Sequence, residues 1–146
     1  MESNEISLPK KILIVDDNED SRDLTAKVLK RSGYLISVAV DGEDALAKAF
    51  SEQPDLILMD RSLPKIDGLE VTRRLKQQES FRSVPIVALT AHAMRGDREK
   101  ALEAGCDGFI SKPINVRSLP EQIRSYLEGG SGSLIDAEQH QDIDCG

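Results

Sequence analysis

Five short, almost wholly aliphatic runs separated by amphipathic segments constrain the fold of this chain most strongly. The runs span residues 11–16, 34–39, 55–60, 84–90 and 108–112. Continuous apolar runs of this kind are typical of strands buried on both faces, as in a parallel sheet. Strand and helix alternate along the chain, which implies right-handed crossovers and helices on both faces of the sheet. The sequence therefore predicts an α/β fold around a five-stranded parallel sheet.

The segments between the runs are predicted to be helices, at residues 19–31, from 41 to Pro54, from Leu69 onward, at 94–104 and at 115–128. Gly33 is expected to cap the first helix at its C-terminus, and Asp41 the second at its N-terminus. Apolar side chains recur at helical spacing and define the predicted inner faces. They are Leu24, Val28 and Leu29 in the first helix, Ala45, Leu46, Ala49 and Phe50 in the second, and Leu119, Ile123, Tyr126 and Leu127 in the last.

Length and composition limit the class of protein. A chain of 146 residues accommodates one ordinary domain. We place it at residues 10–128, after an N-terminal extension at 1–9 and before a flexible Gly/Ser and acidic tail at 129–146. The formal net charge of −7 disfavours a direct nucleic-acid partner, which would require a local excess of Lys and Arg.

The cysteines and the hydropathy pattern bear on the compartment. Cys106 and Cys145 lack the spacing of metal ligands, which suits a reducing environment. No segment approaches the roughly 18 consecutive apolar residues that a membrane span requires. The N-terminal residues contain no apolar signal core. We therefore expect a cytoplasmic protein without membrane insertion.

Polar residues whose side chains can bind a metal or react lie at the ends of the predicted strands. Asp16 and Asp17 close the first strand, Asp60 the third, Thr90 the fourth and Lys112 the fifth. Ligands of doubly wound sheets bind beyond the carboxyl ends of the strands, so these side chains are expected to converge. Three carboxylates at one edge need a counter-charge, and oxygen ligands in a partly open site suit Mg²⁺. A carboxylate can then attack phosphorus, provided that the incoming charge is neutralised.

Each of these residues alone has an ordinary structural explanation. An Asp pair after a strand is more often a turn or a helix cap, and a Lys-Pro pair is usually a turn. The combination in this order is what indicates function. It is accompanied by Ile-Val-Asp-Asp at 14–17, Leu-Met-Asp at 58–60, Leu-Pro-x-x-Asp-Gly at 63–68, Ala-Leu-Thr-Ala at 88–91 and Lys-Pro at 112–113.

With these motifs, residues 10–128 resemble the response-regulator receiver domains of two-component systems. The resemblance implies a flavodoxin-like three-layer sandwich with the strand order 2-1-3-4-5. It also implies that Asp60 is the phosphoacceptor. Asp16, Asp17, Asp60 and the backbone carbonyl of Ser62 would bind Mg²⁺, and Lys112 would pair with the phosphoryl group.

The family also implies a switch. Thr90 is similar in position to the switch hydroxyl, and Phe109 to the aromatic residue that moves inward with it. Pro113 falls where the family has a cis peptide bond. Ser62 and His92 occupy positions that tune the phosphoryl lifetime.

The implied partners are a sensor histidine kinase or a histidine phosphotransfer protein and a downstream protein target; a homodimer is also compatible with the sequence. On this interpretation the chain is a regulator and not an enzyme. The runner-up is a Mg²⁺-dependent phosphohydrolase with an Asp nucleophile, but such enzymes need a second Asp two residues later, where this chain has Ser62. A flavin or nucleotide binder would need a phosphate-cradling loop after the first strand, and the anionic residues 16–19 disfavour it. A degenerate receiver that acts only by protein contact is disfavoured because all five signature positions are present.

Overall fold

The computed structural model describes residues 9–60, 63, 66–90, 95–112 and 114–128, with the backbone alone for 95–98. The elements are, in chain order, β1 (Lys11–Val15), α2 (Glu19–Arg31), β2 (Leu35–Ala39), α3 (Gly42–Glu52), β3 (Leu56–Asp60), α4 (Gly68–Lys76), the 3₁₀ turn η1 (Glu79–Phe81), β4 (Ile86–Thr90), α5 (Arg95–Ala104), β5 (Gly108–Ser111) and α6 (Leu119–Glu128). They alternate as predicted.

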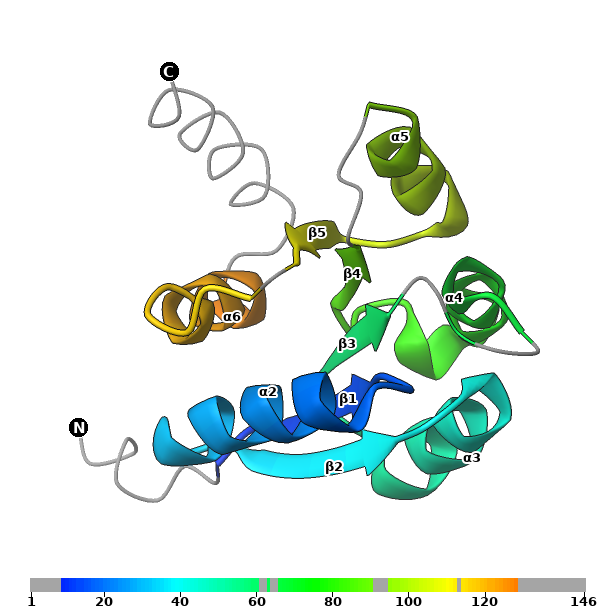
Figure 1. Ribbon diagram of the computed structural model, residues 1–146. Helices are drawn as coiled ribbons and strands as arrows, with labels where there is room; N and C mark the ends of the chain where they lie inside the picture. The colour runs from blue at the N-terminus through cyan, green and yellow to red at the C-terminus, as the bar shows by residue number, and fades with distance from the viewer. Residues whose placement is uncertain (1–8, 61–62, 64–65, 91–94, 113, 129–146) are drawn as a thin grey trace.

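The five strands form one parallel sheet in the order β2-β1-β3-β4-β5 (Figure 1). This confirms the predicted fold class and strand order. The order in which strands are added to the sheet reverses after β1, because β2 lies on one side of β1 and β3 lies on the other. The carboxyl ends of β1 and β3 therefore meet at one edge of the sheet, where doubly wound folds bind ligands.

Helices cover both faces of the sheet and produce two separate apolar cores. Because strand side chains alternate between faces, Leu13 and Ile57 pack with α3, α4 and α5, whereas Ile12 and Leu58 pack with α2 and α6. All five residues of β3 are buried, as are all five of β4. The continuous apolar runs in the sequence follow from this burial on both faces.

Local capping explains where the first two helices begin and where α2 ends. The side chain of Asn18 accepts a hydrogen bond from the Ser21 amide at the start of α2, and Asp41 accepts one from the Asp44 amide at the start of α3. Gly33 has φ = 98° just after α2, a left-handed conformation that a residue with a Cβ rarely adopts. The predicted caps at Gly33 and Asp41 are therefore confirmed.

Three details differ from the sequence-based expectations. α6 begins at Leu119 rather than at residue 115, because the Asn115 side chain accepts hydrogen bonds from the Arg117 and Ser118 amides and so forms a local turn. Leu24 on α2 and Phe50 on α3 were assigned to inner faces but are 44% and 49% exposed. The helical repeat identifies an apolar stripe, whereas the neighbouring elements decide how much of its width is covered.

Lys76, the last residue of α4, forms hydrogen bonds with the segments that precede β4 and β5 at the amino edge of the sheet. Its Nζ donates to the carbonyl oxygens of Phe81, Arg82 and Val84 at 3.2, 3.3 and 2.7 Å. It also lies 3.1 Å from Oδ2 of Asp107, and the Lys76 side chain is only 15% exposed. This lysine ties the end of α4 to the segments that lead into β4 and β5.

Cys106 lies in the core on the α3–α5 face and is 5% exposed. Burial raises the pKa of its thiol to about 11, against the weaker lowering effect of the Thr72 hydroxyl at 3.9 Å. We expect Cys106 in a Cys145→Ser protein to react very slowly with a thiol-reactive disulfide at about pH 8, where only about one thiol in a thousand is ionised. The rate, followed by absorbance, should increase as the pH rises toward the pKa and should jump on unfolding in urea. Reaction at the rate of a free thiol in the native protein would contradict the buried placement.

Some expectations lie outside the described residues: the N-terminal extension apart from Pro9, the tail at 129–146, the Ser62 carbonyl, His92 and the Pro113 peptide bond. Within the described ranges, none of the helices is both long enough and apolar enough to cross a bilayer.

Candidate functional site

The acidic residues come together at the carboxyl edge on neighbouring strands. β1 and β3 pair with Val15 opposite Met59, so the next residues, Asp16 and Asp60, are level with each other. Asp17 follows in the loop to α2. One carboxylate oxygen from each of the three acidic residues lies within 4.8 Å of the other two. Asp16 is 0% exposed and Asp60 4%, whereas Asp17 is exposed to solvent.

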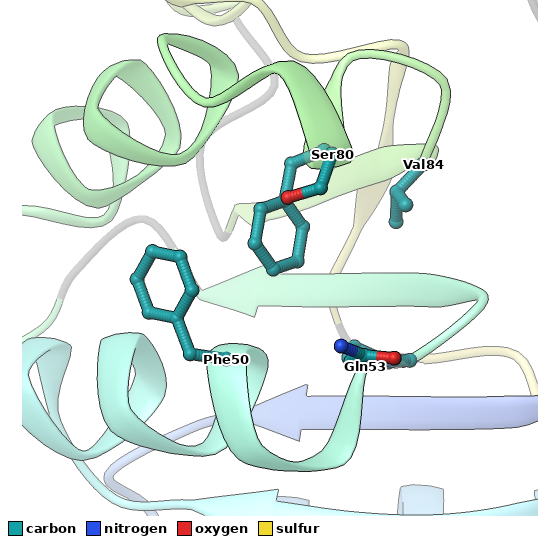
Figure 2. Close-up of a pocket in the computed structure, with 6 residues that line it drawn as sticks. Phe50, Gln53, Ser80 and Val84 are labelled. Carbon is teal, nitrogen blue, oxygen red and sulfur yellow. The ribbon is translucent and has the colours of Figure 1, made fainter.

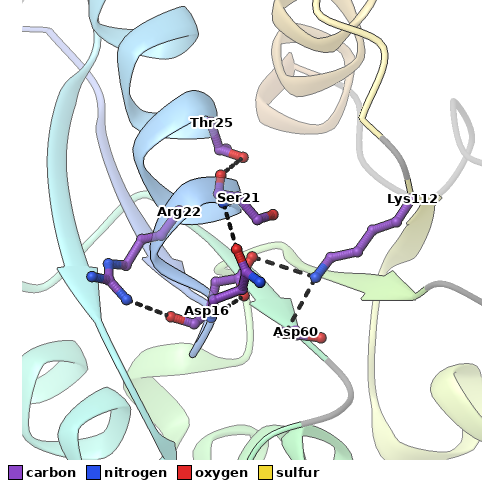
Figure 3. A network of polar contacts seen from close by, with 7 residues as sticks. Asp16, Ser21, Arg22, Thr25, Asp60 and Lys112 are labelled. Atoms are coloured by element: carbon purple, nitrogen blue, oxygen red, sulfur yellow. Dashed lines mark hydrogen bonds and ion pairs between the residues drawn. The ribbon is translucent and has the colours of Figure 1, made fainter.

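Lys112 reaches this cluster from the end of β5 (Figure 3). Its Nζ lies 3.4 Å from Oδ2 of Asp16 and 3.3 Å from Oδ2 of Asp60, and the lysine side chain is 21% exposed. Two carboxylates about 5 Å apart repel by roughly 3 kcal/mol at an effective dielectric constant of about 20. Three carboxylates outnumber this ammonium group, so the cluster has an excess of negative charge.

This donor set fits a hard divalent cation. Carboxylate oxygens are the ligands that Mg²⁺ prefers, and Mg²⁺ keeps several waters when a site is open on one side. The exposed Asp17 provides that open side, and the buried Asp16 and Asp60 provide the fixed side. A divalent cation together with Lys112 would balance the three negative charges.

Thr90 lies at the same edge of the sheet as the cluster, and the side chains of Thr90 and Phe109 belong to the face opposite that of Asp16 and Asp60. Thr90 ends β4 opposite Ser111 of β5, and the Lys112 amide donates to its carbonyl oxygen at 2.8 Å. The two-residue repeat places the Thr90 side chain on the same face as Ala88, in the α3–α5 core against which Phe109 packs. Thr90 is 8% exposed. The structure thus brings Asp16, Asp17, Asp60 and Lys112 together and places Thr90 at the same edge.

Two residues that the sequence analysis did not single out, Asn18 in the loop from β1 to α2 and Arg22 in α2, form hydrogen bonds with Asp16. The Asn18 amide donates to Oδ1 of Asp16 at 2.9 Å, while the Asn18 side chain caps α2. Arg22 donates from Nη1 to the backbone carbonyl of Asp16 at 3.1 Å (Figure 3). The Asn residue directly before a helix was a usable capping signal, but the side-chain bond of Arg22 to the backbone has no sequence signature.

A separate pocket of about 240 Å³ is lined by residues that include Gln53 and Ser80, which Figure 2 labels. Phe50 and Phe81 line it, with ring centroids 5.2 Å apart and planes at 85°. Pro54 and Val84, which precede β3 and β4, also line it, so the pocket lies toward the amino edge of the sheet. It contributes no residue to the acidic cluster.

Comparison with known proteins agrees with this geometry. The family model of the response regulator receiver domain matches residues 12–124. The polar-differentiation response regulator DivK of Brucella anthropi is 45% identical over 120 residues, which are 82% of this chain and 98% of that protein.

Solved structures give the same result. The receiver domain of the sensor histidine kinase PA1611 from Pseudomonas aeruginosa, solved with a magnesium ion coordinated in its active site cleft, superposes with a TM-score of 0.76 at 37% identity. The match covers 82% of this chain and 98% of that one. The chemotaxis response regulator CheY4 of Vibrio cholerae also gives a TM-score of 0.76, at 29% identity, over 81% and 98% of the two chains. The fold, the acidic edge and these relatives together show that the chain belongs to the response-regulator receiver family of two-component signalling proteins.

Proposed function

We propose that this chain is a phosphorylation switch in which Asp60 accepts a phosphoryl group with the help of Mg²⁺. The observation that carries the proposal is the convergence of three carboxylate oxygens within 4.8 Å, two of them on buried residues, with Lys112 at hydrogen-bonding distance. A purely structural set of acidic residues would be expected to spread out in solvent, because their mutual repulsion is unfavourable.

Asp60 is the residue in this cluster best placed to act as the nucleophile. It ends the central strand β3, so the sheet fixes its backbone, and its side chain is almost wholly buried beside the carboxylate of Asp16. An oxygen of Asp60 attacks the phosphorus of a phosphohistidine, and an O–P bond forms while the P–N bond breaks. The departing imidazole keeps the bonding electron pair and takes a proton from solvent.

The surrounding residues neutralise charge during this transfer. Mg²⁺ bound by Asp16, Asp17, Asp60 and the Ser62 carbonyl would supply charge neutralisation for the phosphoryl oxygens. Lys112 already contacts Asp60 and can turn its ammonium group toward the new phosphoryl oxygens. No large movement of the main chain is needed to bring this cation to the product.

The phosphoryl group then biases the neighbouring face of the molecule. It adds about −1.5 to −2 charge units at the sheet edge. The Thr90 hydroxyl would turn toward it as a donor and vacate volume that Phe109 fills, which alters the face made by α5, β5 and α6. We place the cis-proline of the family at Pro113, directly after Lys112.

Membership of the family implies a phosphodonor kinase and a downstream target. We propose a sensor histidine kinase or a histidine phosphotransfer protein as the donor, with contact through protein surfaces in the cytoplasm. The receiver would comprise residues 10–128. In this proposal the chain turns over no separate substrate, so small phosphomonoesters should not release phosphate catalytically.

Removal of the metal tests this function directly. After incubation with acetyl phosphate and Mg²⁺, we expect the intact mass of the protein to increase by one phosphoryl group. The same incubation with a chelator should give no adduct. Borohydride reduction of the acyl phosphate, followed by peptide mapping, should place the modification at Asp60. An adduct that forms equally well without divalent metal would contradict the proposed role of the acidic cluster.

A further inference from the structure

The backbone carbonyl of Asp16 is buried but lies just beyond the last paired residue of β1. The pairing of β1 with β2 ends at Val15 and Ala39, one residue before this carbonyl. Asp16 itself is 0% exposed, so its backbone oxygen needs a donor from the protein. Arg22, in the first turns of α2, supplies one from Nη1 at 3.1 Å (Figure 3).

This carbonyl belongs to the peptide group that links the two acidic residues of the loop. Because a peptide group is planar, fixing the direction of its oxygen also fixes the direction of its N–H and of the following Cα. The hydrogen bond from Arg22 therefore restrains the position from which the exposed Asp17 side chain projects. Asp16 is held independently, since its amide donates to the Ala39 carbonyl at 3.1 Å and its Oδ1 accepts from the Asn18 amide at 2.9 Å.

Arg22 is anchored on a helix that is itself tied to the loop. The Ser21 amide donates to the Asn18 side chain at 2.8 Å, and the Thr25 hydroxyl donates to the Ser21 carbonyl at 2.9 Å. Arg22 is half-buried, whereas the next residue of the helix, Asp23, is exposed. The guanidinium thus connects a rigid element to the one peptide group shared by Asp16 and Asp17.

We propose that Arg22 is a positioning residue for the metal site, which acts through the Asp16 carbonyl to hold the Asp17 carboxylate where it can share a cation with Asp16 and Asp60. The inference rests on the proposed function, because it assumes that these carboxylates bind Mg²⁺. Residues that orient metal ligands without touching the metal change metal affinity substantially when they are replaced.

The sign of the effect separates positioning from electrostatics. A guanidinium close to a metal site repels the cation, so loss of its charge alone would strengthen Mg²⁺ binding. Loss of a positioning contact would weaken it. A decrease in affinity on removal of a positive charge is therefore the signature of the hydrogen bond to the Asp16 carbonyl.

The experiment is a calorimetric titration of Mg²⁺ into the metal-free full chain, without a phosphodonor. We expect Arg22→Ala to bind Mg²⁺ on the order of tenfold more weakly than the wild type. Arg22→Lys, which keeps the charge and a donor on a shorter side chain, should lose about threefold. Lys27→Ala is the matched control, because it removes the same charge from an exposed position on the same helix and should bind as the wild type does.

Each outcome bears on the inference. Arg22→Ala binding Mg²⁺ as tightly as the wild type, or more tightly, overturns it while leaving the proposed function intact. A wild-type chain that binds no Mg²⁺ overturns both. Circular dichroism checks that the variants fold. If Arg22→Ala does not fold, Arg22→Lys provides the test: weaker Mg²⁺ binding than the wild type supports the inference, and unchanged binding contradicts it.

Discussion

Replacing Asp60 with Asn should abolish the phosphoryl adduct completely. The amide has the same shape as the carboxylate, but it is neutral and is not a nucleophile toward phosphorus. The variant should still fold, because Asn occupies the same volume and relieves repulsion with Asp16 and Asp17. The measurement is intact mass after incubation with Mg²⁺ and acetyl phosphate.

The control for this variant is Asp55→Asn, just before the other end of the same strand. Asp55 accepts a hydrogen bond from the Lys11 amide at the amino edge, far along β3 from the acidic cluster. This variant should be labelled as the wild type is. Labelling of Asp60→Asn to the wild-type extent would assign the phosphoacceptor to another residue and would remove the basis of the proposed function.

Replacing Lys112 with Met should have the second largest effect, and it should act in opposite directions on two quantities. The rate of phosphoryl acceptance should fall about 100-fold, because the developing charge loses a positioned cation. Mg²⁺ affinity should rise, because the ammonium group that contacts Asp16 and Asp60 no longer competes with the metal for their oxygens.

The two quantities are measured by the initial rate of adduct formation and by Mg²⁺ titration. Lys48→Met serves as the control, since Lys48 is 40% exposed, pairs with Asp44 on α3 and lies outside the cluster. It should change neither quantity. An unaltered rate of phosphoryl acceptance in Lys112→Met would show that this lysine neutralises the carboxylates of the resting protein and takes no part in the transfer.

The main features of the fold follow from sequence pattern because the sheet is buried on both faces. A strand such as β3 must be apolar throughout, so its sequence differs visibly from that of an amphipathic helix. The convergence of Asp16 and Asp60 was also predictable, since both stand at the carboxyl ends of strands that a doubly wound topology places together.

The details that escaped prediction depend on contacts between elements. The exposure of Phe50 reflects how little of α3 its neighbours cover, and the late start of α6 reflects a local turn at Asn115 that competes with the helix. The bond from Arg22 to the Asp16 carbonyl depends on the angle at which α2 leaves the loop. No periodicity in the sequence encodes that angle.

Lys76 and Lys112, two half-buried lysines at opposite edges of the sheet, differ in how many of their protons are already used in hydrogen bonds. A lysine ammonium has three protons to donate. Lys76 faces four acceptors, from Phe81, Arg82, Val84 and Asp107, so its capacity is saturated. Among the described residues, Lys112 has two acceptors, Asp16 and Asp60, which leaves one proton uncommitted. Lys76 therefore has no proton left for another acceptor. Lys112 can donate to one further oxygen and still keep its hydrogen bonds to both carboxylates.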